Sequence, residues 1–210
     1  MTTAQPGLLA VWNAIAPEHD GTFNVWYDSE HLDERLAVPG FRNARRYRAA
    51  DDRHRYAALY DLDSPAVLVS AAYRAVLASP SPRTRAIMPH FRDVSRAACA
   101  VVFDSRPDAR PRAALAILGL RDTDGNALAR LSPSGTARIR VARPDPEATG
   151  GPTPEQALRS APDRLPPPFV LVEADTPTEV SDAVAAMGAA LAVDWDRRFT
   201  LIVDRSASLA

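Results

Sequence analysis

The chain has 210 residues, with 25 basic and 26 acidic side chains and a formal net charge of −1 at pH 7. This length fits one large domain or two small ones, and a charge near zero creates no field that favours nucleic acid or an anionic membrane. Every basic residue is arginine. Because lysine is absent, side-chain Schiff-base chemistry and a phosphate-loop lysine are excluded.

The start of the chain and its single cysteine both suggest an intracellular protein. Residues 1–7 (M-T-T-A-Q-P-G) lack a charged and apolar leader, and no later run reaches the length of a membrane span. Cys99 lies in an apolar run and is the only cysteine, so it is expected to be a buried small hydrophobe. We therefore expect a soluble, cytoplasmic protein that contacts neither nucleic acid nor membrane.

The first predicted elements are a strand and a helix. The strand runs from Leu8 to Ile15, with alternate side chains on opposite faces of a sheet. Thr22 is the predicted N-cap of the helix, because its hydroxyl can accept from free amides of the first turn. Pro39 and Gly40 end the helix, since the residue before a proline avoids the α region and glycine permits the turn.

This helix has two unlike arcs at about 100° per residue. The narrow arc, predicted to face the core, holds Val25, Ser29, Leu32 and Leu36. The broader arc combines three aromatic with three titratable side chains: Phe23, Trp26, Tyr27, Glu30, His31 and Glu34. His31 lies four residues from Tyr27 and three from Glu34, so these side chains can form a hydrogen-bonding cluster on the helix surface.

The rest of the first half completes a βαββαβ order. Strands predicted at 43–48 and 55–62 form a hairpin, and the second places Tyr56 and Tyr60 on one face. Ser64 and Pro65 begin a second helix that continues to residue 77 and stops at the prolines of 79–82. A fourth strand at 97–103 is apolar enough to be buried on both faces. This order is typical of the ferredoxin-like split unit.

Part of this half resembles a known family. The run W-Y-D-S-E-H-L-D-E-R-L-A-V-P-G-F, followed by A-R-R-Y, is similar to the first helix and second strand of EthD-like proteins in the dimeric α/β-barrel (ferredoxin-like) superfamily. The matching residues are Trp26, Tyr27, His31, Pro39, Gly40, Phe41, Arg45 and Arg46. The resemblance covers residues 8–103 and implies the fold of these proteins, whereas an activity does not follow from a fold.

The second half is interpreted as a degenerate copy of the first. Its predicted strands are at 113–120, 136–143, 169–173 and 195–204, and its clearest helix is at 176–191. The helix expected between the first two strands is reduced to 126–131 at most. Residues 144–168 are rich in proline, glycine and acid, and are expected to form a long, partly ordered loop, with a functional lid as the alternative.

The predicted fold class is therefore α+β, with two ferredoxin-like βαββαβ units at residues 1–105 and 106–210. Their antiparallel four-stranded sheets are expected to pack face to face as an intrachain α/β barrel, because each sheet leaves one apolar face to be covered. Since the second unit has lost a helix, we expect any pocket to belong to the first.

His31 is the strongest candidate for proton transfer. Its ordinary pKa lies near neutrality, and Tyr27 and Glu34 beside it complete the predicted catalytic set. The structural alternative is a histidine that closes an exposed helix cluster or supports the following turn. Neither H-x-x-H nor H-E-x-x-H occurs, and D-T-D-G-N at 122–126 fits a turn better than a calcium loop, so no metal is predicted.

The predicted substrate-binding residues are Trp12, Asn13, Trp26, Arg46 and Tyr60. An aromatic pocket between sheets and a guanidinium that holds an anion are the functional interpretation. In the structural interpretation, the aromatic residues pack in the core. The arginines of 42–48 then lie on a solvated strand face and pair with Asp51 and Asp52.

Two functions are consistent with these residues. The first is a small-molecule-binding barrel that oxygenates, isomerises, cyclises or decarboxylates a hydrophobic or aromatic carbonyl compound without a cofactor. There His31 shuttles a proton, Tyr27 and Tyr60 bind a substrate oxygen, and Arg46 holds an anion. The second is a non-catalytic ligand carrier or assembly module. The expected partner is a small hydrophobic or aromatic ligand, and a homodimer is left open.

Overall fold

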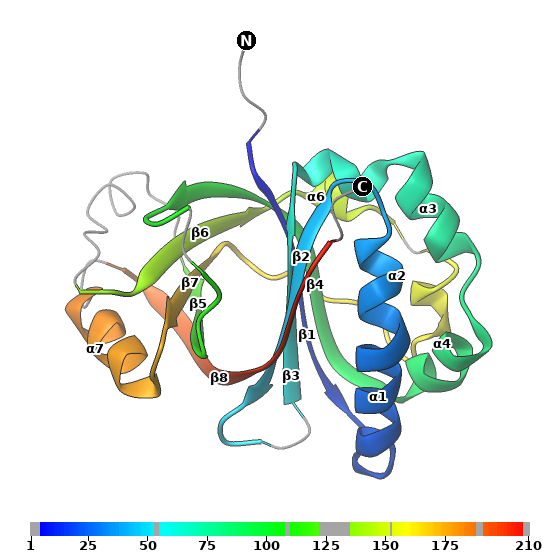
Figure 1. Ribbon diagram of the computed structural model, residues 1–210, viewed down its shortest axis with the longest axis horizontal. Helices are drawn as coiled ribbons and strands as arrows, with labels where there is room; N and C mark the ends of the chain where they lie inside the picture. Colours follow the sequence, from blue (N-terminus) through cyan, green and yellow to red (C-terminus); the bar gives the residue numbers. More distant parts are fainter. Residues whose placement is uncertain are drawn as a thin grey trace.

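The computed structural model describes residues 5–52, 55–107, 110–121, 135–151, 153–187 and 191–207. Within them, eight antiparallel strands form one closed barrel in the order β1-β3-β2-β8-β5-β7-β6-β4 (Figure 1). The strands are β1 (Gly7–Ile15), β2 (Phe41–Ala49), β3 (Arg55–Leu62), β4 (Phe91–Asp104), β5 (Ala114–Leu120), β6 (Arg138–Pro144), β7 (Phe169–Ala174) and β8 (Val193–Ser206).

Two long strands join the halves of the barrel. β4 and β8 each have 14 residues, more than the sequence predicted. One part of β4 pairs with β1 and its end pairs with β6, while β8 pairs with both β5 and β2. The two halves therefore share one continuous barrel instead of forming two separate sheets stacked face to face, and the chain closes this barrel by itself.

The helices cover the two outer sides of the barrel (Figure 1). α1 (Asp20–Trp26), a π-helical turn (Tyr27–His31) and α2 (Leu32–Leu36) form one continuous helix. This helix lies on the outer face of the first half together with α3 (Ala71–Ala78), α4 (Pro82–Ile87) and α6 (Pro146–Thr149). α7 (Pro177–Met187) covers the second half. None of the described helices combines the length and apolarity needed to cross a membrane.

The organising helix differs from its prediction at its start and in its orientation. It begins at Asp20, directly after a 3-10 turn at Pro17–His19, so Thr22 is not its N-cap. Its aromatic arc faces the sheet, and of the predicted core arc Val25 is 61% exposed, whereas Leu32 is buried. Burying three large aromatic rings removes far more apolar surface from water than burying the narrow arc, which explains the orientation. The stop at Gly40 is confirmed by its positive φ of 94°.

Side chains of β1 alternate as predicted. Leu9, Val11 and Ile15 point outward to the helices, and Leu8 and Trp12 point into the barrel. The interior is filled by an apolar cluster to which strands of both halves contribute, including Leu59, Cys99, Ile117, Phe169, Leu171 and Phe199. Cys99 is buried and free, as expected. The barrel is thus a packed core and not a channel.

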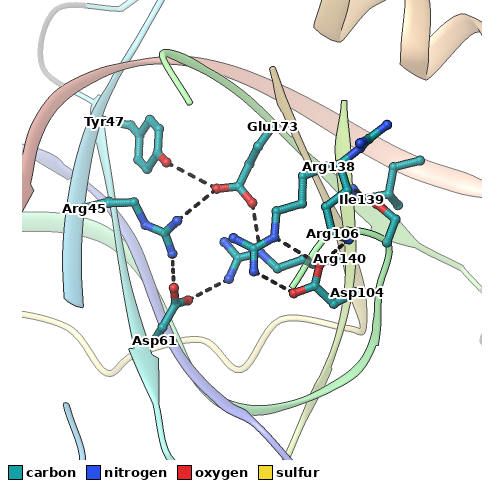
Figure 2. Close-up of polar contacts among 10 residues, drawn as sticks. Arg45, Tyr47, Asp61, Asp104, Arg106, Arg138, Ile139, Arg140 and Glu173 are labelled. Atoms are coloured by element: carbon teal, nitrogen blue, oxygen red, sulfur yellow. Dashed lines mark hydrogen bonds and ion pairs between the residues drawn. The ribbon is translucent and has the colours of Figure 1, made fainter. Parts of the chain in front are cut away.

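One end of the barrel interior is closed by a buried ion network (Figure 2). Arg140 donates to Asp61 at 2.7 Å and to Glu173 at 2.9 Å, and Arg45 bonds the same two carboxylates. Tyr47 reaches Glu173 at 3.5 Å. Burial alone would raise the pKa of Asp61, but the two guanidinium groups hold it well below its usual range. Because Arg45 and Asp61 come from the first half and the other two from the second, the network ties the halves together.

The second half contains the later helix as predicted, and Thr176 with Glu179 forms a capping box in which each side chain bonds the other's backbone N–H, at 3.2 and 2.9 Å. Residues 144–168 are more ordered than expected, with α6 and a 3-10 turn at Gln156–Leu158. The helix predicted at 126–131, the turn at 122–126 and His54 lie outside the described residues.

Candidate functional site

The candidate site lies between the outer face of β1, β3 and β4 and the helix α1–α2. The strands contribute Leu9 and Tyr60, the helix contributes Tyr27 and His31, and together they enclose a cavity of about 20 Å³. The complete lining is Leu9, Val11, Tyr27, His31, Arg35, Tyr60, Tyr73, Met88, Phe91, Arg96, Glu155 and Arg159. Apolar side chains thus surround a small group of phenols, one imidazole and several charged groups.

The π-helical turn positions the imidazole. In an α-helix, residues five apart point in different directions, whereas the wider π turn stacks them. Trp26 and His31 are five apart, and their ring centroids are 4.4 Å from each other. The Trp26 indole N–H donates to the Thr84 hydroxyl at 3.2 Å, which fixes the plane against which His31 packs. Trp26 therefore supports His31 and does not line the cavity.

Tyr27 and Tyr60 form a pair of buried phenols. The Tyr60 hydroxyl donates to that of Tyr27 at 3.1 Å. Burial raises the pKa of both groups, so both phenols are protonated at neutral pH. Since Tyr27 accepts this bond, its own proton is available to an acceptor in the cavity.

His31 is 7% exposed, and its Nδ1 has no hydrogen-bond partner among the described residues. Burial, and then the positive charges of Arg35, Arg159 and Arg46, hold its pKa well below the ordinary value. The imidazole is therefore neutral at pH 7 and available as a proton acceptor. The predicted bond to Glu34 is not formed, because its carboxylate lies 3.8 Å from Nδ1, beyond hydrogen-bond distance.

Arg46 does not reach the cavity. Its guanidinium bonds the carboxylate of Asp28 and, at 2.8 Å, the side chain of Asn24, and it lies 4.2 Å from the ring centroid of Tyr27. Arg45 and Arg46 are both buried, so among the arginines of this strand only Arg42 and Arg48 are solvated, and Arg42 pairs with Asp63 at 2.6 Å and not with the predicted Asp51 or Asp52. Arg46 therefore packs against the ring of Tyr27, and its charge is already paired with Asp28.

Trp12 and Asn13 lie elsewhere. Trp12 points into the barrel, where it contacts Phe169 and Trp195 at centroid distances of 5.3 and 5.6 Å, so it shares no pocket with Tyr60 on the opposite face of the sheet. Both predicted residues line a cavity of about 960 Å³ at the mouth of the barrel. Charged groups at this mouth pair with each other near solvent, as in the 2.9 Å contact of Arg164 with Asp93. The predicted substrate-binding set is therefore divided between two places.

An ion pair that sequence reasoning missed attaches a distant segment to the site. Arg35 on α2 donates to both oxygens of Glu155, at 2.6 and 2.5 Å, and both residues are buried. They are 120 residues apart, and no local pattern signals such a pair. Arg96 could have been found, because alternation with Val94 and Ala98 puts it on the helix-facing side of β4, but the predicted strand began one residue too late.

Residues 145–151 and 153–164, here named the strap, cross the outer face of β4. The Asp145 amide donates to Ala98 at 2.8 Å where the strap leaves the sheet, and the Arg164 amide donates to Val94 at 2.9 Å where it returns. Arg96 lies between these two anchor points. The strap therefore encloses Arg96 and covers one side of the cavity, in the part of the chain that was predicted as a loop or lid.

Comparisons with known proteins inform the fold. No protein-family model and no curated protein sequence matches this chain. A solved structure of an anthrone oxidase-like protein is similar, with a TM-score of 0.58 and 11% identity over 99% of this chain and 95% of the other. A haem-binding protein from Thermus thermophilus has a TM-score of 0.56 and 10% identity, over 95% of this chain and 92% of the other. A variant chlorite dismutase from Candidatus Nitrospira defluvii has a TM-score of 0.51 and 9% identity, over 97% of this chain and 93% of the other. The chain has the dimeric α/β-barrel fold.

One of these similar structures is that of a haem-binding protein, and haem iron is commonly held by a histidine, so the histidines of this chain are the candidate ligands. They are at positions 19, 31, 54 and 90. Among the described histidines only His31 is buried, and its cavity of about 20 Å³ is far too small for a cofactor, whose pocket ordinarily measures roughly several hundred Å³. The site does not fit haem. Within the described residues, no group of three or more His, Cys, Asp or Glu side chains is arranged to hold a metal ion.

Proposed function

We propose that this protein binds a hydrophobic or aromatic carbonyl compound on the outer face of its first half and transfers a proton there without a cofactor. The observation that carries the proposal is the convergence of a neutral buried imidazole, a phenol with a free proton and several guanidinium groups on one cavity. These groups match the needs of proton abstraction next to a carbonyl.

In this mechanism His31 accepts a proton from the carbon next to the substrate carbonyl. The electron pair left behind moves onto the carbonyl oxygen, where Tyr27 donates its hydrogen bond, and Arg35 and Arg159 stabilise the enolate charge. Return of the proton to another carbon gives an isomer, attack on a second carbonyl gives a ring, and reaction with dioxygen gives an oxygenated product. Glu34, 3.8 Å from His31, holds the imidazolium after proton transfer.

Substrate entry requires movement of the strap. A cavity of about 20 Å³ holds one water molecule at most, and not an aromatic compound. Two open grooves of about 420 and 390 Å³ reach the site beside the strap, and both are lined by Thr149, Gly150 and Gly151. The strap is accordingly a lid that opens for the substrate and closes over it, which is the alternative that its sequence left open.

The proposal includes an evolutionary component. The chain is an EthD-like protein built from two ferredoxin-like units, at residues 1–105 and 106–210. In support, the strands of each half lie adjacent in the same relative order, β4-β1-β3-β2 and β8-β5-β7-β6. The similarity in fold to an anthrone oxidase-like protein favours oxygenation among the possible outcomes. Because the chain closes its own barrel, a homodimer is not needed to complete the site.

A non-catalytic ligand carrier is the alternative function. It is favoured by the tight packing around His31, where two aromatic rings lie at centroid distances of 4.4 and 4.8 Å. A carrier would bind the same class of compound in the grooves beside the strap and release it unchanged.

The experiment starts from protein freshly purified from its source. Native mass spectrometry identifies a retained compound and counts subunits, and the compound is then incubated with the wild-type protein and with His31→Ala. We expect turnover to fall by about 10²- to 10⁴-fold in this variant with the melting temperature retained. His90, which is half-buried and does not line the cavity, supplies the control, and His90→Ala should turn over normally. A compound recovered unchanged after incubation with the wild type would leave only the carrier.

A further inference from the structure

Arg96 gives the site a charge preference that the proposed mechanism does not use. We propose that the natural ligand is an apolar compound with a carboxylate, and that Arg96 binds this carboxylate at the floor of the grooves beside the strap. This inference deepens the proposed function and rests on it for the position of the reacting carbonyl.

Arg96 is a buried cation without an anionic partner among the described residues. It is 5% exposed, and its guanidinium donates to the backbone carbonyl of Thr149 at 3.0 Å and to the Tyr73 hydroxyl at 3.3 Å. Other buried arginines on this face are paired, Arg35 with Glu155 and Arg46 with Asp28. A buried charge is strongly destabilising unless an opposite charge compensates it, so Arg96 is the position where an anion is most favourable.

The geometry leaves room for that anion. A guanidinium has five N–H donors, and Arg96 uses two of them within the described structure. Of the residues that the structure describes, Arg96 is also the one that lines the enclosed cavity and both grooves. A carboxylate that arrives through either groove therefore meets remaining N–H groups, which can bind its two oxygens side by side.

The walls of the grooves define the rest of the ligand. The apolar part of one groove is formed by Leu68, Val69, Leu77 and Pro154, and that of the other by Pro146, Ala157, Pro162 and Leu165. Besides Arg96, the charged residues are Arg74 and Glu147 in the first groove, and Arg159 and Asp163 in the second. The apolar parts of the walls fit an aromatic or aliphatic body. An apolar body with an acid group at one end matches both the walls and the floor.

The test uses 2-naphthoate and its neutral analogue 2-naphthamide as probes, with dissociation constants measured by calorimetry. We expect the wild-type protein to bind the acid at least tenfold more tightly than the amide. Arg96→Gln should reduce this preference to near unity. Arg85 provides the matched control, because it is exposed, is not among the residues that line either groove and loses the same charge, so Arg85→Gln should keep the preference. Equal binding of the two probes, or a preference that survives in Arg96→Gln, overturns the inference.

Two further variants keep the test decisive. If Arg96→Gln does not fold, Arg96→Lys retains the charge but loses the planar fork, and a preference reduced at least threefold is expected, whereas an unchanged preference overturns the inference. His31→Ala should bind naphthoate with its preference intact. If turnover depends on His31 but the wild type shows no preference for the acid, only the Arg96 assignment fails. If the preference stands but His31→Ala leaves turnover unchanged, only the catalytic proposal fails.

Discussion

The two outer faces of the barrel are covered in similar ways but contain different chemistry. The first face packs aromatic rings, an imidazole and paired arginines against β1, β3 and β4. The second face, under α7, consists of aliphatic residues: Ala114, Ala116, Leu118, Leu120, Ala137, Ile139, Val141, Val170, Val172, Ala174, Val180, Ala183, Met187 and Leu191. Equivalent strand order thus produces two buried faces: the buried cluster under α7 is aliphatic, whereas the first face also buries a histidine and several arginines.

This difference shows where the function is encoded. A dry aliphatic face stabilises the fold and has no reason to contain charge. Buried charges on the first face each require a partner from another element, as when Arg35 of α2 bonds Glu155 of the strap. Such groups are expensive to bury and are retained where a function needs them. The four predictions below separate the two faces by the size and kind of their response.

The largest effect is expected from breaking the ion pair of the first face. Glu155→Leu removes the two short hydrogen bonds of the buried Arg35 and leaves it only the 3.5 Å contact with Glu34, so it should lower the free energy of unfolding by about 3–5 kcal/mol. Urea denaturation measures the change. The double variant Arg35→Met with Glu155→Leu should recover most of the loss, because both charges are then absent. A single variant within about 1 kcal/mol of wild type, on the order of a surface ion pair, would show that this face is not organised by the pair.

A slightly smaller effect is expected from a cavity in the second face. Leu118→Ala removes a buried side chain beneath α7 and should lower the free energy of unfolding by about 2–5 kcal/mol. Binding of naphthoate, measured under conditions where the variant is still folded, should not change. A loss of binding out of proportion to the unfolded fraction would contradict the assignment of the ligand to the first face alone.

Acid should weaken the first face through His31. Its pKa is lowered in the folded protein, so as the pH falls below about 6.5 the unfolded chain binds a proton that the folded chain does not. The free energy of unfolding therefore keeps its full value above the pKa of His31 in the unfolded chain. It decreases as the pH falls below that pKa, by up to about 1.4 kcal/mol per pH unit. His31→Phe should remove this component of the slope, which urea denaturation at several pH values can measure. Equal slopes in wild type and variant would mean that His31 titrates normally.

The smallest effect is expected from the phenol pair. Tyr60→Phe removes the hydrogen bond to Tyr27 and should lower the free energy of unfolding by about 1 kcal/mol. Turnover should fall modestly, since Tyr27 keeps its own proton but loses a partner that orients it. Tyr27→Phe should reduce turnover more at a similar loss of stability. Equal turnover in the two variants would remove the distinction between donor and support.

The sequence predicted most of the fold because periodicity reports burial. The alternation of β1, the stop at Gly40 and the helix that follows Thr176 were each determined by a few neighbouring residues, and all three predictions are confirmed. The orientation of the helix was predicted wrongly for its first part, where Val25 is exposed, and correctly for Leu32, which is buried. Two arcs of comparable apolarity can each face a sheet. The aromatic residues on the facing strands decided between them, and that is a tertiary effect.

The candidate site could be predicted only in part for the same reason. Tyr27 and His31 share a helix, so their proximity follows from spacing, and Tyr60 follows from its strand face. Trp12 was misplaced relative to them, since a closed barrel separates inner and outer faces that a local pattern treats alike. Glu155 could not be predicted, because contacts between distant segments leave no periodic signal, whereas the alternation of β4 places Arg96 on the helix-facing side.

A crystal structure of the protein with bound 2-naphthoate tests the central claim most directly. The ring should lie in a groove beside the strap, with the carboxylate within hydrogen-bond distance of Arg96. Density for the probe at the barrel mouth against Trp12 and Trp195, with the first outer face unchanged, would contradict the account.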